Sequence, residues 1–324
     1  MDYMPLVTII IPVYNGSNFL AEAIDAALAQ NYKNIEVLVV NDGSKDEGAS
    51  EKIALSYGAR IRYLRKENGG VSSALNYAFD NMKGEWFSWL SHDDLYYPQK
   101  IEKQIQFINE LKKEKPDLNL NKITIRCATE SIDKDGRVIK VPSYSNVPVE
   151  EEPIDTIIDN VYNYRLSGCA FLLPSSCVKD VGGFREDIRT VSDVEYWYRL
   201  LFSGYRFYCM PKDRLVKNRS HGKQVGKTKV TLFDKELDDL HMSIADRLAD
   251  SDEFYSLEAM EKFYHGLVKR KIKNAAVHTK RMYLRGKMSI PRYYILLPLI
   301  DLKWKVIGSC RNMARYVYRK INVK

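Results

Sequence analysis

Two adjacent carboxylates stand at the end of an aromatic, apolar run of the chain. The run Trp86–Leu90 reads WFSWL, and the aspartate pair Asp93 and Asp94 follows it closely. Side chains alternate across a strand, so one acid can hold a hard cation while the other accepts hydrogen bonds from a ligand. Aspartates are also common in turns that cap a following helix. The surrounding residues decide between a ligand site and a solvated turn.

The elements on either side of the pair indicate an open α/β sheet. β-Branched runs predict strands, and apolar residues at helical spacing predict helices between them. We expect strands over 6–11, 35–40, 61–64 and 86–90 and helices over 17–30 and 46–57. Alternating strands and helices imply a doubly wound sheet with parallel strands, and near-continuous apolar strands fit burial on both faces. Such sheets bind ligands beyond the carboxyl ends of their strands, where Tyr14 and Asp42 would join the aspartate pair.

Tyr14 and Asp42 offer contacts that a nucleotide needs. A tyrosine ring provides a face on which a base stacks, and a carboxylate accepts a hydrogen bond from an imide N–H or a ribose hydroxyl. The chain has no G-x-G-x-x-G after its first strand and no G-x-x-x-x-G-K-[ST], so the dinucleotide-binding and P-loop phosphate cradles are absent. A divalent metal on one carboxylate of the pair is the simplest remaining way to bind a diphosphate.

The order of five motifs resembles that of family 2 glycosyltransferases, the inverting enzymes of the GT-A fold. The motifs are TIIIPVYN (8–15), VVNDGS (39–44), ENGGVSSALN (67–76), GEW (84–86) and LSHDD (90–94). The resemblance extends to about two thirds of the chain, through segments over 168–170, 182–184, 192–195 and 219–221. It implies an α/β, Rossmann-like GT-A fold with a doubly wound mixed sheet, and a sugar-transfer activity.

The resemblance also implies roles for residues of the first half. Tyr14 and Asp42 match positions that hold the nucleotide base. Asp93 matches an acid on the ribose side, and Asp94 matches the carboxylate that binds a divalent metal, Mg²⁺ or Mn²⁺, under the diphosphate. Ser91 departs from the family, in which many members have an Asp that opens a D-x-D-D pattern. The acidic triplet is reduced to its last pair, which keeps Asp94 as the expected metal ligand and leaves open whether Ser91 weakens the site.

A helix in the second half carries the candidate catalytic base. The pattern over 191–201 predicts an amphipathic helix with Ser192 or Asp193 as its N-cap. Inverting transfer is a single displacement that needs one carboxylate to take the proton of the acceptor hydroxyl. The resemblance assigns this role to Asp193; alternatively, Asp193 only caps the helix and interacts with its dipole. Glu195 faces elsewhere on the helix and is the weaker candidate.

Arg219 and His221 belong to a polar, Gly-containing loop that follows a strand region expected over 205–216. In the family a comparable Arg-x-His segment closes over the donor diphosphate, where a guanidinium and an imidazole would stabilise the leaving nucleotide. The resemblance therefore implies that both residues bind the donor. A solvated basic loop is the alternative that the residues leave open.

Charge divides the chain into two parts. Residues 265–324 hold 16 Lys or Arg against one acid, a net of +15, which leaves −7 for residues 1–264 out of the chain's +8. We expect a GT-A catalytic domain over 1–225 and a mostly helical, basic C-terminal extension over 226–324. Its apolar run Tyr293–Ile300 is far shorter than the roughly 20 residues of a membrane span. Basic segments with aromatic and aliphatic residues bind the membrane interface, and a helical bundle or a homo-oligomer contact is the alternative.

Composition agrees with a globular enzyme. The chain has 324 residues, of which 45% are hydrophobic and 28% charged. Five scattered cysteines without C-x-x-C spacing suit a reducing cytosol rather than a zinc site, and the N-terminus lacks a secretory-signal pattern. No nucleic-acid-binding motif accompanies the basic region. We expect a cytoplasmic protein, peripheral on the inner face of the membrane.

These patterns and the resemblance predict an inverting, metal-dependent glycosyltransferase of cell-surface polysaccharide synthesis. Its donor would be a nucleotide-sugar, UDP-linked because an Asp favours a base with an imide N–H, and its acceptor a glycan or lipid-linked glycan. Two alternatives remain: a membrane-docked glycan-binding or scaffold protein with a decayed site, and a sugar-nucleotide pyrophosphorylase. The segment PVYNG (12–16) differs from the Gly-rich, Arg- and Lys-containing loop typical of pyrophosphorylases.

Overall fold

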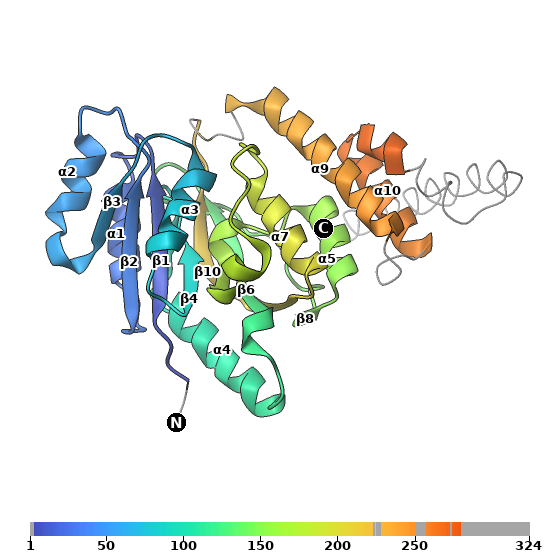
Figure 1. The fold of residues 1–324 in the computed structure, drawn as a ribbon, viewed down its shortest axis with the longest axis horizontal. Coiled ribbons are helices and arrows are strands. Elements are labelled where there is room, and N and C mark those ends of the chain that lie inside the picture. Colours follow the sequence, from blue (N-terminus) through green and yellow to red (C-terminus); the bar gives the residue numbers. More distant parts are fainter. Residues whose placement is uncertain (1–2, 223, 225–227, 251–256, 273, 280–324) are drawn as a thin grey trace, which may run out of the picture. The chain divides into compact units, whose positions relative to one another are not determined.

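The structure is a computed structural model that describes residues 3–222, 224, 228–250, 257–272 and 274–279 (Figure 1). The chain divides into two units. Unit 1 takes Met1–Ile157 and Tyr164–Glu236, and unit 2 takes Ile158–Asn163 and the chain from Leu237 onward. The apolar run Tyr293–Ile300 and most of the basic C-terminal region lie outside the described residues.

Unit 1 is built on a mixed sheet that has ten strands within the described part of the chain. The strand order is β3-β2-β1-β4-β9-β6-β10-β5, with β7 on β6 and β8 on β10. Strands β1 to β4 run parallel, β9 is antiparallel to both β4 and β6, and β10 is parallel to β6. The bounds are β1 (Val7–Val13), β2 (Ile35–Asn41), β3 (Arg62–Arg65), β4 (Trp86–Trp89), β5 (Leu95–Tyr96), β6 (Ile123–Ile132), β7 (Val138–Lys140), β8 (Glu150–Glu151), β9 (Phe171–Pro174) and β10 (Arg206–Arg219).

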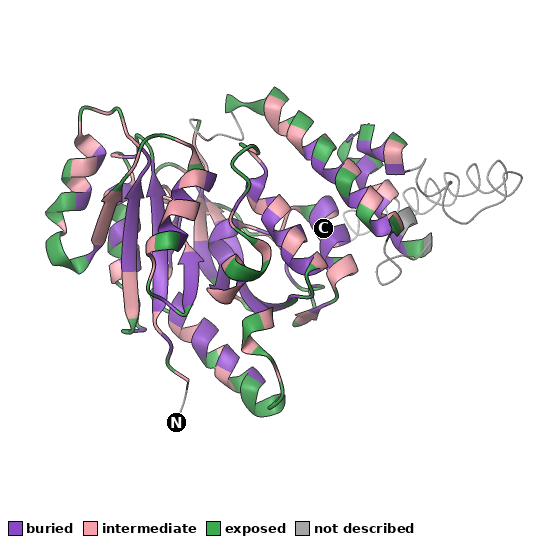
Figure 2. Ribbon diagram, viewed as in Figure 1, coloured by how far each residue is buried: buried purple, intermediate pink, exposed green. Residues whose placement is uncertain are grey.

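Helices cover both faces of this sheet. All seven residues of β1 are buried, and Figure 2 shows the central strands in the colour of buried residues. Alternate residues of β1, among them Ile9 and Ile11, share a hydrophobic cluster with α1 and α4, whereas α3 packs against β1 and β2. The helices of unit 1 are α1 (Leu20–Leu28), α2 (Ala49–Ser56), α3 (Val71–Asn81), α4 (Lys100–Glu114), α6 (Ser176–Val181) and α7 (Ser192–Phe202). This is the predicted doubly wound α/β arrangement.

The first four strands form where the sequence predicts them, with their ends shifted by a few residues. β1 continues past the predicted end at residue 11 and includes Pro12, which lacks a backbone N–H. The strand tolerates this proline because β4 pairs with β1 only as far as Ile10, so Pro12 has β2 as its remaining neighbour. The predicted helix over 17–30 is shorter in the structure, where α1 spans Leu20–Leu28.

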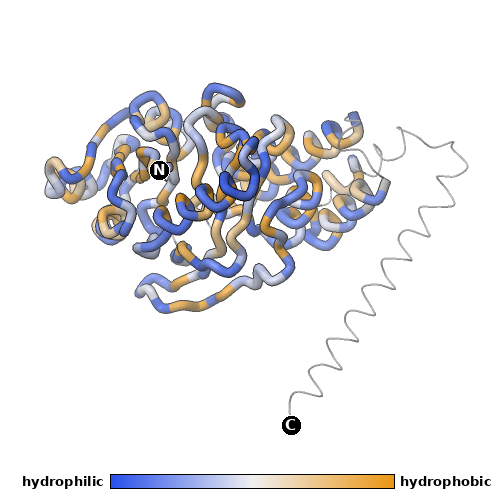
Figure 3. Tube along the Cα trace, turned by 90° about the horizontal axis from the view of Figure 1, so that it is seen from below, coloured by the Kyte–Doolittle hydropathy of each residue, from blue (hydrophilic) through white to orange (hydrophobic). Residues whose placement is uncertain are grey.

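Helices make up unit 2 within the described residues. α5 (Pro153–Asn163) and α9 (Val230–Asp250) pass from unit 1 into unit 2, and α10 (Leu257–Arg270) follows. Within this unit the Tyr162 hydroxyl donates to the Lys262 carbonyl at 3.2 Å. No helix of the described chain is both long and apolar enough to cross a membrane, and Figure 3 shows hydrophilic and hydrophobic segments interleaved along it.

Candidate active site

The carboxyl ends of β1, β2 and β4 bring the first candidate residues to one edge of the sheet. Val13 ends β1 and pairs with Asn41, which ends β2, so Tyr14 and Asp42 begin loops at the same edge. β4 lies on the other side of β1 and runs in the same direction, and the aspartate pair follows its end. The Tyr14 side chain is 42% exposed, whereas Asp42 is buried. The sheet therefore gathers the residues that the topology predicts to lie together.

The loop over residues 66–70 encloses the carboxylate of Asp42. Backbone N–H groups donate to it from Gly69 at 3.0 Å and from Gly70 at 2.7 Å. The Lys66 ammonium donates at 3.1 Å and the Asn68 side chain at 3.0 Å. Gly70 has a φ of +93°, a backbone region that favours glycine. Sequence reasoning gave this loop no role, although its Gly-Gly step signals a close approach of the backbone.

Asp94 is the buried member of the aspartate pair. The backbone N–H of Arg219 donates to its Oδ1 at 2.7 Å, and the Cys169 thiol donates to its Oδ2 at 3.2 Å. Burial and then the charge of Asp93 raise the pKa of Asp94 to about 7. Ser91, which stands where many family members have an acid, donates its own backbone N–H to the Cys169 sulfur at 3.3 Å. Cys169 belongs to the segment 168–170 of the family resemblance, but its contact with Asp94 was not predicted from the sequence.

Asp93 pairs with His221. The imidazole Nε2 lies 2.8 Å from Asp93 Oδ2, and the ring packs 5.3 Å from the ring of Phe19, centroid to centroid. The His92 ring lies against Gly16, and burial lowers the pKa of its imidazole. The structure thus brings His221 to the aspartate pair, across 128 positions of sequence.

Arg219 is the last residue of β10, which corrects its expected place in the loop after that strand. The strand runs further because its pairing with β6 continues to Ile132. The Arg219 side chain is 1% exposed, and its nitrogens donate to Asp93 O, Lys134 O and Glu22 Oε2 at 2.7 to 2.8 Å. In this arrangement the guanidinium holds the turn of the aspartate pair.

Asp193 lies in the first turn of α7. Val191 is the N-cap and no side chain caps the helix, so the prediction of Ser192 or Asp193 as N-cap is wrong. The chain enters the helix one residue earlier, directly after Arg189 and Thr190, whose backbone N–H groups donate to the Glu236 carboxylate. Burial raises the pKa of Asp193 to about 6, against the backbone N–H of Val194, which donates to Oδ1 at 2.8 Å. A carboxylate of this kind is a stronger base than an exposed Asp.

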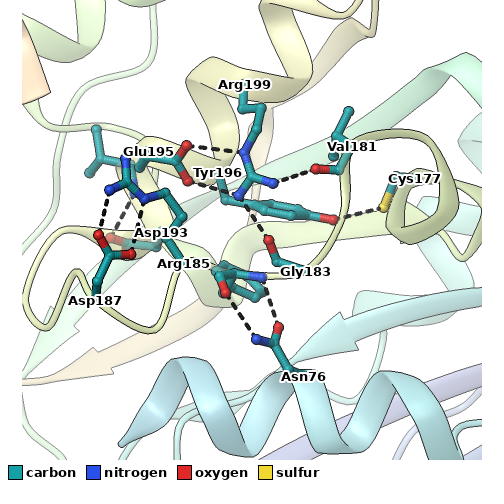
Figure 4. A network of polar contacts seen from close by, with 12 residues as sticks. Asn76, Cys177, Val181, Gly183, Arg185, Asp187, Asp193, Glu195, Tyr196 and Arg199 are labelled. Carbon is teal, nitrogen blue, oxygen red and sulfur yellow. Dashed lines mark hydrogen bonds and ion pairs between the residues drawn. The ribbon is translucent and has the colours of Figure 1, made fainter. Parts of the chain in front are cut away.

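Figure 4 shows that Glu195 points into a different network. Its carboxylate pairs with Arg199 one turn further along the helix, at 2.8 Å. Arg199 also donates to the carbonyls of Val181 and Gly183. Through Arg199, Glu195 therefore stabilises the start of the 182–191 segment. This agrees with the expectation that Glu195 is the weaker candidate for the base.

Two contacts attach the 182–191 segment to the edge of the sheet. The Phe184 ring lies 6.0 Å from that of Trp89, which ends β4, and stacks at 4.3 Å on Tyr196 of α7. Further along the segment, the Arg189 guanidinium donates to the carbonyl of Gly69 in the 66–70 loop. Asn76 of α3 fixes the Phe184 backbone with two hydrogen bonds, of 2.7 and 2.9 Å (Figure 4). These contacts bring the start of α7 to the edge that carries Asp42 and the aspartate pair.

Comparison with known proteins now identifies the family. The family model described as "Glycosyl transferase family 2" matches residues 8–118, which include Tyr14, Asp42 and the aspartate pair. An "uncharacterized glycosyltransferase" of Rickettsia prowazekii is 38% identical over 310 residues, covering 95% of this chain and 88% of the relative. The chain belongs to glycosyltransferase family 2. Membership favours an enzyme over the scaffold and pyrophosphorylase alternatives.

Other relatives are longer than this glycosyltransferase. An "uncharacterized glycosyltransferase" of Rickettsia felis is 43% identical over 252 residues, which are 77% of this chain and 40% of the relative. The chain thus spans about 40% of the length of that relative.

Solved structures confirm the predicted GT-A fold. S. aureus TarS in complex with UDP-GlcNAc has a TM-score of 0.64 at 16% identity, covering 89% of this chain and 78% of that one. The mannosyltransferase PcManGT from Pyrobaculum calidifontis, in complex with GDP-Man and Mn²⁺, has a TM-score of 0.56 at 16% identity, covering 98% and 86%. At these identities the likeness concerns the fold.

Proposed function

We propose that this family 2 glycosyltransferase transfers a sugar, with inversion, from a UDP-sugar to a glycan or lipid-linked glycan acceptor in cell-surface polysaccharide synthesis. The observation that carries the proposal is the attachment of the Asp193 helix to the edge of the sheet, through the contacts of Phe184 with Trp89 and of Arg189 with Gly69. A carboxylate base with a raised pKa and a set of acids at one edge are what a single displacement needs. Action at the inner face of the membrane rests on the basic C-terminal region, most of which lies outside the described residues.

Tyr14 and Asp42 would bind the nucleoside. The exposed Tyr14 ring offers a stacking face, and Asp42 is an acceptor held in one orientation by the 66–70 loop. An acceptor at this place favours a base with a ring N–H donor, such as the imide N–H of uracil. The UDP-GlcNAc complex of TarS supports the same donor class. Asp93, paired with His221, would face the ribose.

The groups that contact the Asp94 carboxylate are compatible with a role of Asp94 as a metal ligand. Its oxygens face a backbone N–H and a thiol, which carry no positive charge. Within the described residues no group of three or more His, Cys, Asp or Glu side chains could hold a metal alone. Mg²⁺ and Mn²⁺ sites often use one or two carboxylates with substrate phosphates, so a cation shared with the diphosphate fits Asp94. Bound there, the cation would offset the charge that develops on the leaving diphosphate.

Asp193 would act as the general base. An acceptor hydroxyl oxygen attacks the anomeric carbon, the bond from that carbon to the phosphate oxygen breaks, and the nucleoside diphosphate leaves with the bonding electrons. The hydroxyl proton passes to Asp193, whose raised pKa of about 6 leaves it mostly ionised at neutral pH and more basic than free Asp. His221 and the backbone around Arg219 would keep the aspartate pair in place during the reaction.

Calorimetry tests this proposal. UDP and GDP are titrated into the full chain with and without Mn²⁺, and into Asp94→Ala and Asp193→Asn variants. We expect Mn²⁺-dependent UDP binding that is lost in Asp94→Ala and kept in Asp193→Asn. A separate assay of sugar transfer should show that turnover is lost in both variants. Asp117→Ala, a change at an exposed aspartate, is the matched control and should bind like the wild type. Absence of nucleotide binding in the wild type would refute the proposed donor class.

A further inference from the structure

The Arg189 side chain contacts the back of the peptide that binds Asp42. Its guanidinium donates to the carbonyl of Gly69, and the N–H of the same peptide group, that of Gly70, donates to Asp42 at 2.7 Å. An ideal Cβ placed on Gly70 would lie 2.7 Å from Arg189 Nη1, so the guanidinium lies directly against this turn. Arg189 therefore packs directly against the loop whose N–H groups hold the Asp42 carboxylate.

The backbone of Arg189 is anchored separately, by Glu236 of α9. The N–H of Arg189 donates to Glu236 Oε1 at 2.8 Å, and the N–H and hydroxyl of Thr190 donate to Oε2 at 2.7 and 2.5 Å. Burial alone would raise the pKa of Glu236, but these hydrogen bonds lower it below its usual value, so the carboxylate is ionised at neutral pH. Glu236 thus fixes the two residues that lead into α7.

A short, buried connection joins this anchor to the catalytic base. Val191 and Ser192, which are 1% and 5% exposed, are the only residues between Thr190 and Asp193. α7 has no side-chain cap of its own, and a carboxylate near a helix N-terminus interacts favourably with the helix dipole. A shift at residues 189–190 must therefore move the first turn of α7, because close-packed segments transmit displacements.

We propose that Arg189 is a positioning residue that couples nucleotide binding at the 66–70 loop to the placement of Asp193. This inference rests on the proposed function. Asp42 already accepts four hydrogen bonds from the 66–70 loop, so a base N–H that bonds to the same carboxylate must displace or share some of them. The resulting change at Gly69 reaches Arg189 and then the start of α7. The coupling works in both directions, as linkage between two sites requires.

Hydrogen exchange measured by mass spectrometry tests the coupling on the full chain. Saturating UDP with Mn²⁺ should slow exchange over 66–71 and over 190–195 in the wild type. In Arg189→Ala we expect protection over 66–71 to remain and protection over 190–195 to be lost, with the UDP dissociation constant changed less than about threefold. Arg189→Lys, which still offers a donor to the Gly69 carbonyl, should retain both.

The matched control is Arg185→Ala in the same segment. Arg185 pairs with Asp187, as Figure 4 shows, and its variant should keep both protected regions. Protection confined to 66–71 in the wild type, or protection of both regions in Arg189→Ala, would overturn the coupling and leave the proposed function standing. If neither UDP nor GDP protects either region, the proposed function itself fails, and the coupling fails with it.

Discussion

The backbone N–H of Arg219 lies 2.7 Å from Oδ1 of Asp94, across 125 positions of sequence. The end of β10 therefore fixes the carboxylate that follows the end of β4. The Arg219 guanidinium adds hydrogen bonds to the carbonyls of Asp93 and Lys134. Arg219 thus holds together the turn that carries the aspartate pair.

Replacing Arg219 by Ala should lower the free energy of unfolding by about 2–4 kcal/mol, because buried hydrogen-bond partners lose a charged donor. Urea denaturation followed by circular dichroism measures the change. Arg206→Ala is the control, since Arg206 pairs with Glu152 at the surface and its loss should cost no more than about 1 kcal/mol. Equal losses in the two variants would show that Arg219 does not act as a clamp.

Asp193 should give the reaction a rising pH profile. A base must be ionised to accept a proton, and its pKa is about 6, so kcat/KM should fall as the pH drops through 6 and level off above about 7. Asp193→Asn should lose about 10²–10⁴-fold in kcat. A profile of the residual activity that keeps the same inflection in Asp193→Asn would assign the titration to another group.

The same shift predicts that Asp193→Asn stabilises the fold. The folded pKa is about 6 and the ordinary value is 3.8, so between these values the folded state binds more protons than the unfolded state. The contribution of Asp193 to the stability of the wild type therefore decreases as the pH rises from 4 to 6, and this loss persists at neutral pH. We expect Asp193→Asn to be more stable at pH 7 by on the order of 1–3 kcal/mol, and no more stable at pH 3.5. Denaturant titrations at both pH values give the comparison.

Cys169 should tune the affinity for a divalent cation. Its thiol donates to Asp94 Oδ2, and partners of this kind typically change metal affinity by about 10–100-fold when removed. Cys169→Ala should weaken the Mn²⁺ dependence of UDP binding by this factor, and Cys169→Ser, which keeps a donor, should weaken it less. Cys209→Ala, at another buried cysteine, controls for general loosening of the core. Equal Mn²⁺ affinities for the Cys169 and Cys209 variants would refute the role.

Two glycines with similar positive φ angles separate the effect of backbone conformation from the effect of contact. Gly70 and Gly136 have φ of +93° and +84°, and only at Gly70 would a Cβ meet a neighbour, Arg189 Nη1 at 2.7 Å. Both Ala variants should lose about 1–3 kcal/mol of stability, because a side chain disfavours a positive φ. Gly70→Ala alone should weaken UDP binding, by about tenfold for the loss of one good hydrogen bond to Asp42. Calorimetry measures the UDP affinity of each variant, and equal affinities would contradict the role of the 66–70 loop.

Parallel strands explain which part of the site is predictable from the sequence. Their carboxyl ends meet at one edge, so short apolar runs that end in Tyr14, Asp42 and the aspartate pair are enough to place these residues together. The strands themselves follow from β-branched runs in the same way. Asp193 required the resemblance, because its helix pattern alone fits a structural cap equally well.

Contacts between distant segments explain what the sequence could not predict. Cys169 reaches Asp94 because β9 returns antiparallel beside β4, a pairing that no local pattern specifies. Arg189 and Glu236 are ordinary exposed charges by residue type, and their hydrogen bonds depend on how the 182–191 segment folds back. The N-cap of α7 was mispredicted for the same reason, since Glu236, 46 and 47 positions away, binds the N–H groups of Thr190 and Arg189 that precede the helix.

The four cysteines of the described chain are buried and free, so the rates at which their thiols are alkylated measure how often the structure around each one opens. An alkylating reagent reaches such a thiol only when the surrounding structure opens, so its labelling rate reports that opening. Cys169 lies between Ser91 and Asp94, whereas Cys209 lies inside β10. Faster labelling of Cys169 than of Cys209 would indicate local opening at the edge of the sheet. Equal rates would indicate unfolding of the whole sheet.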